Sequence, residues 1–125
     1  VICTDHAPHT EYEKSQTFAK APFGIVGLET AVGLAYTFLV KNEVISFTKM
    51  IETMSVNPRK ILGLEEIKFS EGEKANLTVL EKNKKWVVDK NKFKSKSGNT
   101  PFNGYELYCK PYCVINKDQI FYCKV

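Results

Sequence analysis

The spacing of hydrophobic and polar positions changes near residue 65 and divides the chain into two predicted parts. Before this point, apolar residues recur at three- and four-residue steps, which is typical of helices that bury one face. After it, short apolar runs alternate with polar turns, which is typical of a small sheet. The pattern predicts an α/β chain that is mainly helical over residues 1–64 and β-rich over residues 65–125.

The helical part is predicted to open with a strand. Val1–Asp5 is an apolar run that ends in a carboxylate, so we expect a buried strand and then a polar loop as far as Lys20. A first helix is predicted after this loop, and its buried face is expected to carry Leu28, Ala31, Val32, Ala35, Phe38 and Leu39. A second helix is expected to begin at the N-cap Ser46 and to break at Ser55–Pro58, before a short third helix that stops at Gly63.

The β-rich part is predicted to form short strands closed by a hairpin. Strands are expected at Ile67–Phe69, Leu77–Leu80 and Trp86–Val88, joined by polar turns. A closing hairpin is expected from Cys113–Ile115 and Gln119–Tyr122, because both flank a short polar stretch.

The composition is that of an ordinary folded domain, with 125 residues of which 43% are hydrophobic and 26% charged. No apolar run approaches the roughly 20 residues that span a bilayer, and no signal peptide is visible, so we expect a cytoplasmic protein without a membrane partner. The net charge is +4, but the lysines between Lys82 and Lys96 are interspersed with acidic and apolar residues. We interpret them as a solvated surface and expect no nucleic-acid partner.

The cysteines are predicted to be buried free thiols. No Cys-x-x-Cys pair occurs among Cys3, Cys109, Cys113 and Cys123, and most of them lie in strand-like sequence. This spacing gives little support to a zinc ribbon, and buried thiols behave as small hydrophobic side chains.

The densest group of potential metal ligands is Asp5, His6 and His9, directly after the predicted first strand. In α/β barrels, functional residues lie at the carboxyl end of a strand, where a carboxylate can bind a metal and transfer a proton. The commoner explanation of an isolated Asp-His-x-x-His is plainer: the carboxylate caps a turn, and both histidines are ordinary loop residues. The spacing alone does not establish a metal site.

A second candidate element is Pro22-Phe23-Gly24, just before the first predicted helix. Proline sets a rigid bend and glycine carries no side chain, so a ligand could approach the backbone amides near a helix N-terminus that favours negative charge. The alternative is a simple turn from loop into helix.

Two blocks together, Thr4–Thr10 and Ala21–Thr30, resemble the last barrel strand and the following loop of bacterial class I dihydroorotases. The resemblance continues through Asn57–Leu64, Ala75–Val79 and Phe93–Phe102, and so covers nearly the whole chain. It implies the C-terminal portion of a (β/α)8 TIM-type barrel, followed by part of a small β-sandwich domain. Residues 1–64 would be the last strand, active-site loop and C-terminal helices of the barrel, and residues 65–125 the C-terminal part of the sandwich.

The resemblance also implies an activity and its residues. The family hydrolyses the cyclic amide of dihydroorotate reversibly to N-carbamoyl-aspartate in pyrimidine biosynthesis, with a hydroxide activated by one or two Zn2+ ions. Asp5 matches the family's metal-binding catalytic acid/base. His9 matches a residue that contacts the substrate, and Pro22, Phe23 and Gly24 match the loop that lies along the substrate ring. His6 matches no role that we carry over.

The sequence departs from the family pattern in ways that limit what the chain can do alone. The family's remaining metal ligands are not in it, so we expect an inactive fragment that needs the N-terminal part of the same barrel. Because the first strand and the apolar helix face lack that barrel, we also expect poor solubility or partial disorder in the first half. Asn76 stands where the family usually has Asp, and the stretch from Cys109 to Cys123 is unusually rich in cysteine.

Alternative functions stay open at this point. One is a hydantoinase or allantoinase, which acts on other cyclic amides. Another is a non-catalytic dihydroorotase-like partner of aspartate transcarbamoylase. Whether the protein forms a homodimer is left open as well.

Overall fold

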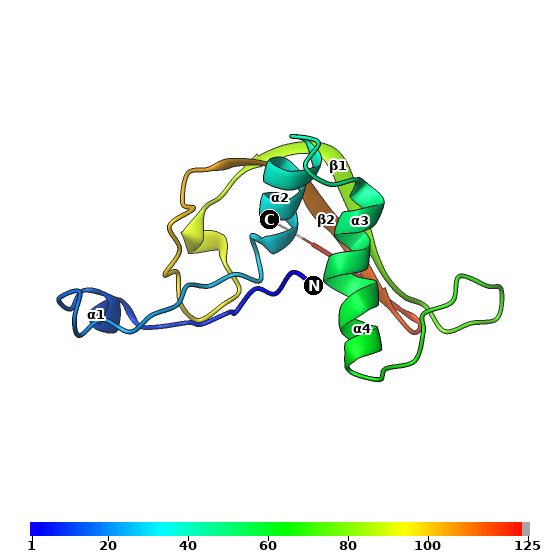
Figure 1. Cartoon of the computed structure of the whole chain (residues 1–125), viewed down its shortest axis with the longest axis horizontal. Coiled ribbons are helices and arrows are strands. Elements are labelled where there is room, and N and C mark those ends of the chain that lie inside the picture. Colours follow the sequence, from blue (N-terminus) through cyan, green and yellow to red (C-terminus); the bar gives the residue numbers. More distant parts are fainter. Residues whose placement is uncertain (124–125) are drawn as a thin grey trace.

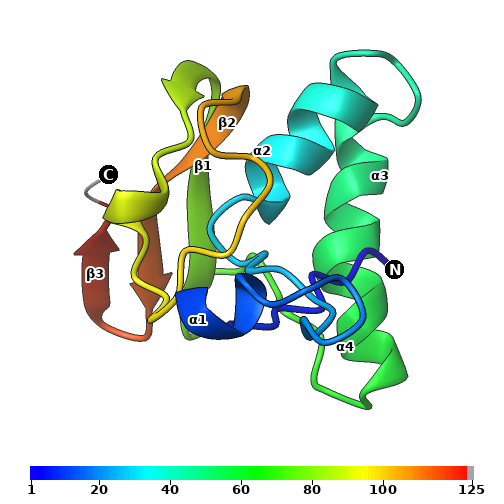
Figure 2. The ribbon, with the colours of Figure 1, turned by 90° about the vertical axis from the view of Figure 1, so that its left-hand side faces the viewer.

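The computed structural model describes residues 1–123, in which helices cover one face of a three-stranded antiparallel sheet (Figure 1, Figure 2). The sheet has the order β1-β2-β3, with strands β1 (Asn76–Val87), β2 (Glu106–Asn116) and β3 (Gln119–Tyr122). The helical elements, which include two π-helices and one 3-10 helix, are α1 (Glu11–Lys14), α2 (Ala31–Ala35), η1 (Tyr36–Val40), α3 (Phe47–Ile51), η2 (Glu52–Val56), α4 (Asn57–Ile61) and η3 (Lys90–Lys92).

The sheet confirms the predicted hairpin and corrects the predicted strands before it. β2 and β3 pair around a turn at which Asn116 is opposite Gln119. The strands expected at Leu77–Leu80 and Trp86–Val88 merge into the single strand β1, which ends at Val87. Glu81 and Lys85, on either side of a register shift, also pair with β2. The strand expected at Ile67–Phe69 is absent, since that segment finds no partner strand.

The helix formed by α2 and η1 packs on β2 through small residues. A Cβ atom placed on Gly33 would lie 2.9 Å from the Trp86 ring and 3.0 Å from a methyl group of Leu107. One turn further on, Thr37 Oγ1 accepts a hydrogen bond of 2.8 Å from the Tyr108 N–H. The missing side chain at Gly33 therefore allows the close approach between helix and sheet.

The face predicted for this helix is only partly correct. Ala35 is buried, but Leu28 is 62% exposed and Phe38 is 46% exposed. Apolar periodicity predicted where the helix lies. Which side of it faces the sheet depends on Gly33, because only a residue without a side chain allows this close approach.

The second predicted helix begins, and the short third one ends, where the sequence places these two boundaries. Ser46 Oγ accepts a hydrogen bond of 3.1 Å from the Lys49 N–H at the N-terminus. At the other end Gly63 has φ +64, and its N–H bonds to the Lys60 carbonyl at 3.2 Å. Both ends follow the usual capping rules.

The predicted break at Ser55–Pro58 is wrong, because α3, η2 and α4 follow one another without interruption. Pro58 has no N–H and would normally break a helix. Here the preceding turn is a π-helix, in which the Asn57 N–H bonds to the Glu52 carbonyl. This wider turn absorbs the proline and lets the helix continue.

The first segment is extended, but it is not the buried strand that was predicted. Val1 is 57% exposed, and Cys3 is also exposed. The segment's strand-like pairing is a single parallel bridge between His6 and Ile25. A buried parallel strand needs a neighbour on each edge, and within residues 1–123 no strand pairs along Val1–Asp5.

The polar loop after this segment contains one helical turn, α1, which projects away from the sheet (Figure 1). Thr10 Oγ1 accepts a hydrogen bond from the Glu13 N–H, and the Glu13 carboxylate accepts one of 2.7 Å from the Thr10 N–H. This capping box is visible in the sequence as Thr-x-x-Glu. The predicted polar loop did not include this helical turn.

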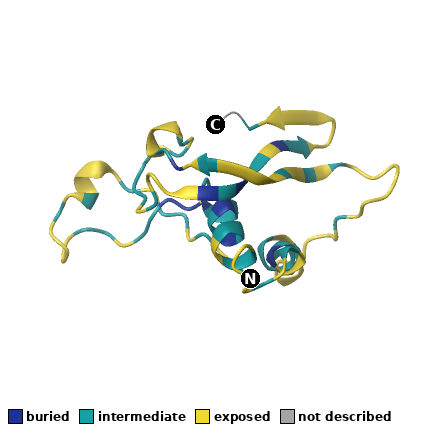
Figure 3. Ribbon diagram, turned by 90° about the horizontal axis from the view of Figure 1, so that it is seen from above, coloured by how far each residue is buried: buried dark blue, intermediate teal, exposed yellow. Residues whose placement is uncertain are grey.

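The buried core is small and lies between the sheet and the helices (Figure 3). Val26, Met50, Val88 and Leu107 are its largest apolar members, each at most 1% exposed. No helix in the described part of the chain is both long and apolar enough to cross a bilayer.

The four cysteines, all within the described residues, are free thiols, as predicted. Cys109 and Cys113 are buried, and burial raises the pKa of the Cys109 thiol. The expected burial is wrong for Cys3, because the segment that carries it has no neighbouring strands to cover it, and Cys123 is only partly buried.

Candidate functional site

The segments that carry the two candidate motifs lie side by side. The Ala7 N–H donates a hydrogen bond of 2.9 Å to the Ile25 carbonyl, next to the bridge between His6 and Ile25. Gly24 has φ +110, and a Cβ atom there would lie 2.5 Å from the Ala7 Cβ. The positive φ and the close contact with Ala7 both require glycine at this position. Gly24 therefore allows the two motif segments to approach each other.

His9 makes the most direct contact between the motifs. Its Nε2 lies 2.8 Å from the Phe23 carbonyl oxygen. Because a carbonyl oxygen only accepts hydrogen bonds, Nε2 must carry the proton and donate it. The Phe23 side chain itself is 86% exposed, so the loop is held by its backbone.

Lys14 holds the same loop from the other motif's side. Its Nζ donates hydrogen bonds to the Pro22 carbonyl at 2.9 Å and to the Gly24 carbonyl at 3.1 Å. Together with His9 it binds three successive carbonyls of the Pro22-Phe23-Gly24 turn. Lys14 is not among the residues predicted for the site, because its position in a polar loop gives no signal of this role.

His6 serves as a connector between three segments. Its Nδ1 accepts hydrogen bonds from the N–H groups of Gly27 at 3.1 Å and Leu28 at 3.4 Å, so the ring proton is on Nε2. Nε2 in turn lies 3.4 Å from Ser95 Oγ. This arrangement accounts for a histidine to which the sequence assigned no role.

Glu29 completes that connection. Its carboxylate accepts hydrogen bonds from the Lys94 N–H at 3.0 Å, the Ser95 N–H at 2.8 Å and the Ser95 hydroxyl at 2.8 Å. Partial burial opposes ionisation of Glu29, but the bonds from Ser95 and Lys94 outweigh it and hold its pKa below the usual value. Sequence reasoning missed Glu29 and Ser95 as a pair, although both lie in family-like blocks.

Asp5 differs from its neighbours because its carboxylate is exposed and makes no hydrogen bond or ion pair within residues 1–123. Its φ of +43 places it in the left-handed region at the end of the extended segment. Among the described residues, no three His, Cys, Asp or Glu side chains are grouped to hold a metal ion. The structure therefore brings His9 to the Pro22–Gly24 turn and leaves Asp5, four residues before His9, exposed.

A polar hollow of about 620 Å³ lies next to His9, between α1 and the loop at residues 96–100. Its lining includes the lysines Lys14, Lys90 and Lys96 and one carboxylate, Glu11, together with Asn99. The excess of lysines favours an anionic ligand over a neutral one.

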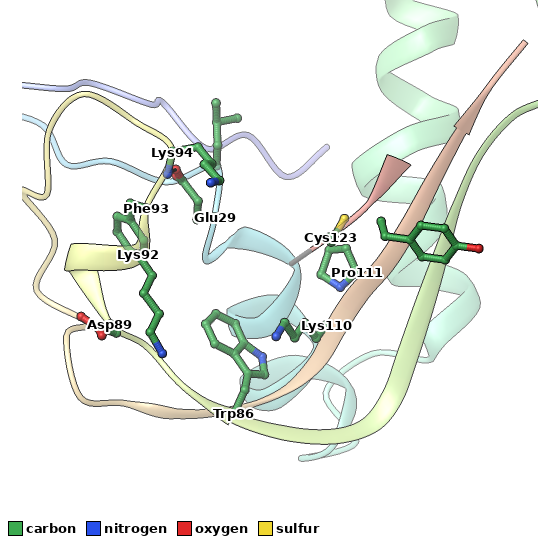
Figure 4. Close-up of a pocket in the computed structure, with 11 residues that line it drawn as sticks. Glu29, Trp86, Asp89, Lys92, Phe93, Lys94, Lys110, Pro111 and Cys123 are labelled. Carbon is green, nitrogen blue, oxygen red and sulfur yellow. Dashed lines mark hydrogen bonds between the residues drawn. The ribbon is translucent and has the colours of Figure 1, made fainter. Parts of the chain in front are cut away.

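A second pocket of about 440 Å³ lies between the sheet and the segment that follows β1 (Figure 4). Trp86, Phe93 and Pro111 form its apolar wall, and Glu29 lies at its edge. The Glu29 carboxylate is engaged by Ser95, and none of the candidate catalytic or binding residues lines this pocket. It is therefore separate from the candidate site.

No protein-family model matches the chain. Curated dihydroorotases are similar to it: that of Chlorobaculum tepidum is 51% identical over 106 residues, which are 85% of this chain and 24% of that protein. The dihydroorotase of Acetivibrio thermocellus is 47% identical over 107 residues, 86% of this chain and 25% of that protein. The dihydroorotase of Bacillus subtilis is 44% identical over 121 residues, 97% of this chain and 28% of that protein. The chain spans about a quarter of the length of these relatives.

Proposed function

Since the chain belongs to the dihydroorotase family, we propose that it is the C-terminal part of a metal-dependent dihydroorotase. The proposed reaction is the reversible hydrolysis of the cyclic amide of (S)-dihydroorotate to N-carbamoyl-L-aspartate, a step of pyrimidine biosynthesis. The observation that carries the proposal is the 51% identity to a curated dihydroorotase over 85% of the chain. The contact between the two motif segments supports it.

Asp5 is the proposed catalytic residue and metal ligand. Amide hydrolysis needs a group that takes a proton from the attacking water and returns it to the leaving ring nitrogen. A carboxylate without internal hydrogen bonds is free to do both, and Asp5 meets that condition within the described residues. Its place at the end of an extended segment suits a barrel site.

His9 and the turn Pro22-Phe23-Gly24 are the proposed substrate-binding elements. The Nε2–H of His9 is occupied by the Phe23 carbonyl, which leaves Nδ1 as an acceptor for a substrate N–H. All three carbonyls of the turn accept hydrogen bonds from His9 or Lys14. The turn can therefore offer a substrate ring the N–H groups of Phe23 and Gly24 and the backbone surface at Gly24. The lysines around the neighbouring hollow suit the carboxylate of dihydroorotate.

Zn2+ is the proposed cofactor, as one or two ions in the complete site. Asp5 fits such an ion as one ligand, whereas the nitrogens of His6 contact Gly27, Leu28 and Ser95 and are not free for it. When bound, the metal supplies a Lewis acid that lowers the pKa of a bound water. We propose that its other ligands come from the rest of the same protein.

The proposed architecture assigns residues 1–64 to the end of a (β/α)8 barrel and residues 65–125 to the C-terminal part of a β-sandwich. The segment Val1–Asp5, whose residues Val1, Cys3 and Asp5 are exposed, supports this assignment, because a parallel strand is normally covered on both edges and both faces. The N-terminal part of the barrel is its proposed partner.

The test is turnover by the full-length protein that contains this chain. Dihydroorotate, hydantoin and allantoin are supplied separately, and wild type is compared with Asp5→Asn and with the control Asp118→Asn, a turn residue far in sequence from the site. We expect hydrolysis of dihydroorotate, a loss of kcat of about 10²–10⁴-fold for Asp5→Asn, and wild-type kinetics for the control.

Other outcomes would reject the proposal. Turnover of hydantoin or allantoin without dihydroorotate would identify a different cyclic amidase. No turnover of any of the three by the metal-loaded protein would favour a non-catalytic partner of aspartate transcarbamoylase.

A further inference from the structure

The loop that follows η3 reaches back to both motif segments, and Asn99 is its main point of contact. The Asn99 Nδ2 donates hydrogen bonds to the Ala7 carbonyl at 3.0 Å and to the Gly24 carbonyl at 3.3 Å. Its Oδ1 accepts a hydrogen bond of 3.2 Å from the His9 N–H. One side-chain amide therefore joins a segment 92 residues earlier to another 75 residues earlier.

The direction of the amide is determined by its partners. Two carbonyl oxygens face one side of it, and a carbonyl can only accept, so the NH2 group must be on that side. A backbone N–H faces the other side and requires the oxygen there. Aspartate has nearly the same shape but no donor, so it would turn an anionic oxygen toward two carbonyls.

Neighbouring contacts strengthen the same connection. The Asn99 carbonyl accepts a hydrogen bond of 3.1 Å from the N–H of Val26, which is fully buried. The Ser97 hydroxyl lies between the His9 carbonyl and Asn99 Oδ1, at 2.7 Å from the latter. The loop is thus fastened by backbone and side-chain bonds to residues on both motif segments.

The position of Asn99 matters for the proposed chemistry. Ala7 lies two residues after Asp5, and Gly24 is in the turn proposed to lie along the substrate ring. A shift of one segment against the other would move the carboxylate relative to the bound ring, and a displacement of about 1 Å can cost about 10²-fold in rate.

We propose that Asn99 is a positioning residue of this site, whose amide sets the spacing between the segment bearing Asp5 and the turn bearing Gly24. The inference rests on the proposed function, because it assigns catalysis to one segment and substrate binding to the other. Asn99 itself need touch neither the substrate nor the reacting atoms.

The test uses three variants of the full-length protein. Asn99→Asp replaces the NH2 group, which donates hydrogen bonds, with an oxygen that accepts them. Asn99→Ala removes the whole amide and leaves room for water. The control is Asn103→Asp, which keeps the Oδ1 that accepts the hydrogen bond from the Lys90 N–H. Each variant is assayed for kcat and KM with dihydroorotate, and for amide hydrogen exchange without substrate.

We expect Asn99→Asp to lower kcat per folded enzyme about 100-fold and to raise KM, because both segments lose their fixed spacing. Asn99→Ala should lose less, about 10-fold in kcat, and the control should match wild type. Hydrogen exchange in Asn99→Asp should become faster at residues 5–10 and 22–27 and stay unchanged elsewhere.

Three results would overturn the proposal: wild-type kcat and KM in Asn99→Asp, wild-type exchange at both segments, or faster exchange throughout the protein with an unchanged KM. The last result would mean that Asn99 only supports folding. Failure of the proposed function is a separate outcome, seen as an inactive wild-type enzyme. The exchange experiment would still report whether Asn99 holds the two segments together.

Discussion

The Glu29 carboxylate accepts hydrogen bonds from both the backbone N–H and the hydroxyl of Ser95, which is 66 residues later in the chain. Ser95 Oγ also lies 3.4 Å from His6 Nε2. These contacts join the start of the chain, the N-terminal approach to α2 and the loop after η3. The candidate site is therefore held by residues from both predicted parts of the chain.

This contact predicts a specific sensitivity to acid. The pKa of Glu29 lies below its usual value of 4.5, so the ionised form stabilises the fold above about pH 4.5. This contribution is lost as the pH falls through the lowered pKa. Glu29→Gln should cost about 1 kcal/mol at pH 7 and should flatten the decline of stability below about pH 4.5. Thermal unfolding of the full-length protein between pH 3 and pH 7 measures both effects.

The matched control is Glu81→Gln, at an exposed position on β1. It should keep the wild-type acid profile. An unchanged profile in Glu29→Gln would show that the contact contributes nothing to stability.

A second prediction concerns the glycine of the candidate substrate turn. Gly24→Ala forces a Cβ atom to within 2.5 Å of the Ala7 Cβ, so the turn must move away from the Asp5 segment. We expect about a 100-fold loss of kcat/KM in the full-length enzyme. Gly104→Ala is the control, because it has φ +83 but no atom within 4 Å of the added Cβ. Equal effects of both variants would indicate backbone strain alone.

A third prediction tests the packing of α2 on the sheet. Gly33→Ala gains helix propensity of about 1 kcal/mol but presses its methyl group on Trp86 and Leu107, and overpacking costs about 1–3 kcal/mol. We expect a net loss of stability, seen as a lower Tm. Ser55→Ala, exposed on the second helix, should not lower it. A Tm above wild type for Gly33→Ala would show that the interface has spare room.

A fourth prediction uses Cys3 to test the architecture. In the 125-residue chain, a thiol reagent should modify Cys3 quickly and should leave the buried Cys109 and Cys113 unmodified without denaturant. In the full-length protein, Cys3 should become protected, because the proposed neighbouring strands cover its segment. Rapid labelling of Cys3 in both proteins would contradict the barrel assignment.

A fifth prediction concerns the chain by itself. Its buried core is small, and Phe18, Phe23 and Phe69 are each more than 80% exposed, at 91%, 86% and 86%. We expect poor solubility and a broad thermal transition by circular dichroism. A sharp, cooperative transition with full helical signal would contradict this.

Local rules predicted those elements whose cause is local. Ser46 caps its helix with its own side chain, Gly63 ends it, and the hairpin between β2 and β3 needs only a short polar turn between two apolar runs. The errors occurred where the structure depends on a segment far away in the chain or on a helical turn wider than an α-helical one. Pro58 is absorbed by a π-helical turn, and the segment Val1–Asp5 has no neighbour to make it a buried strand.

The candidate site divides in the same way. Asp5, His9 and the Pro22–Gly24 turn were found from the motif blocks, and their assigned roles are still predictions. The residues that hold these motifs together, Lys14, Glu29, Ser95 and Asn99, were not found as a set. Lys14 and Asn99 bind mainly backbone carbonyls and N–H groups, which leave no pattern in a sequence. Glu29 and Ser95 also bind each other, but they are 66 residues apart in the chain.

The sequence by itself determined the helix caps, the closing hairpin, the change from helical to β-rich character and the resemblance to dihydroorotases. Only the tertiary structure decided which face of α2 meets the sheet, why Gly24 must be glycine, and that Asn99 joins Ala7, His9 and Gly24. The physical reason is range. Capping and periodicity act within a few residues, whereas a side-chain amide that bridges segments 75 and 92 residues away acquires its partners only when the whole chain has folded.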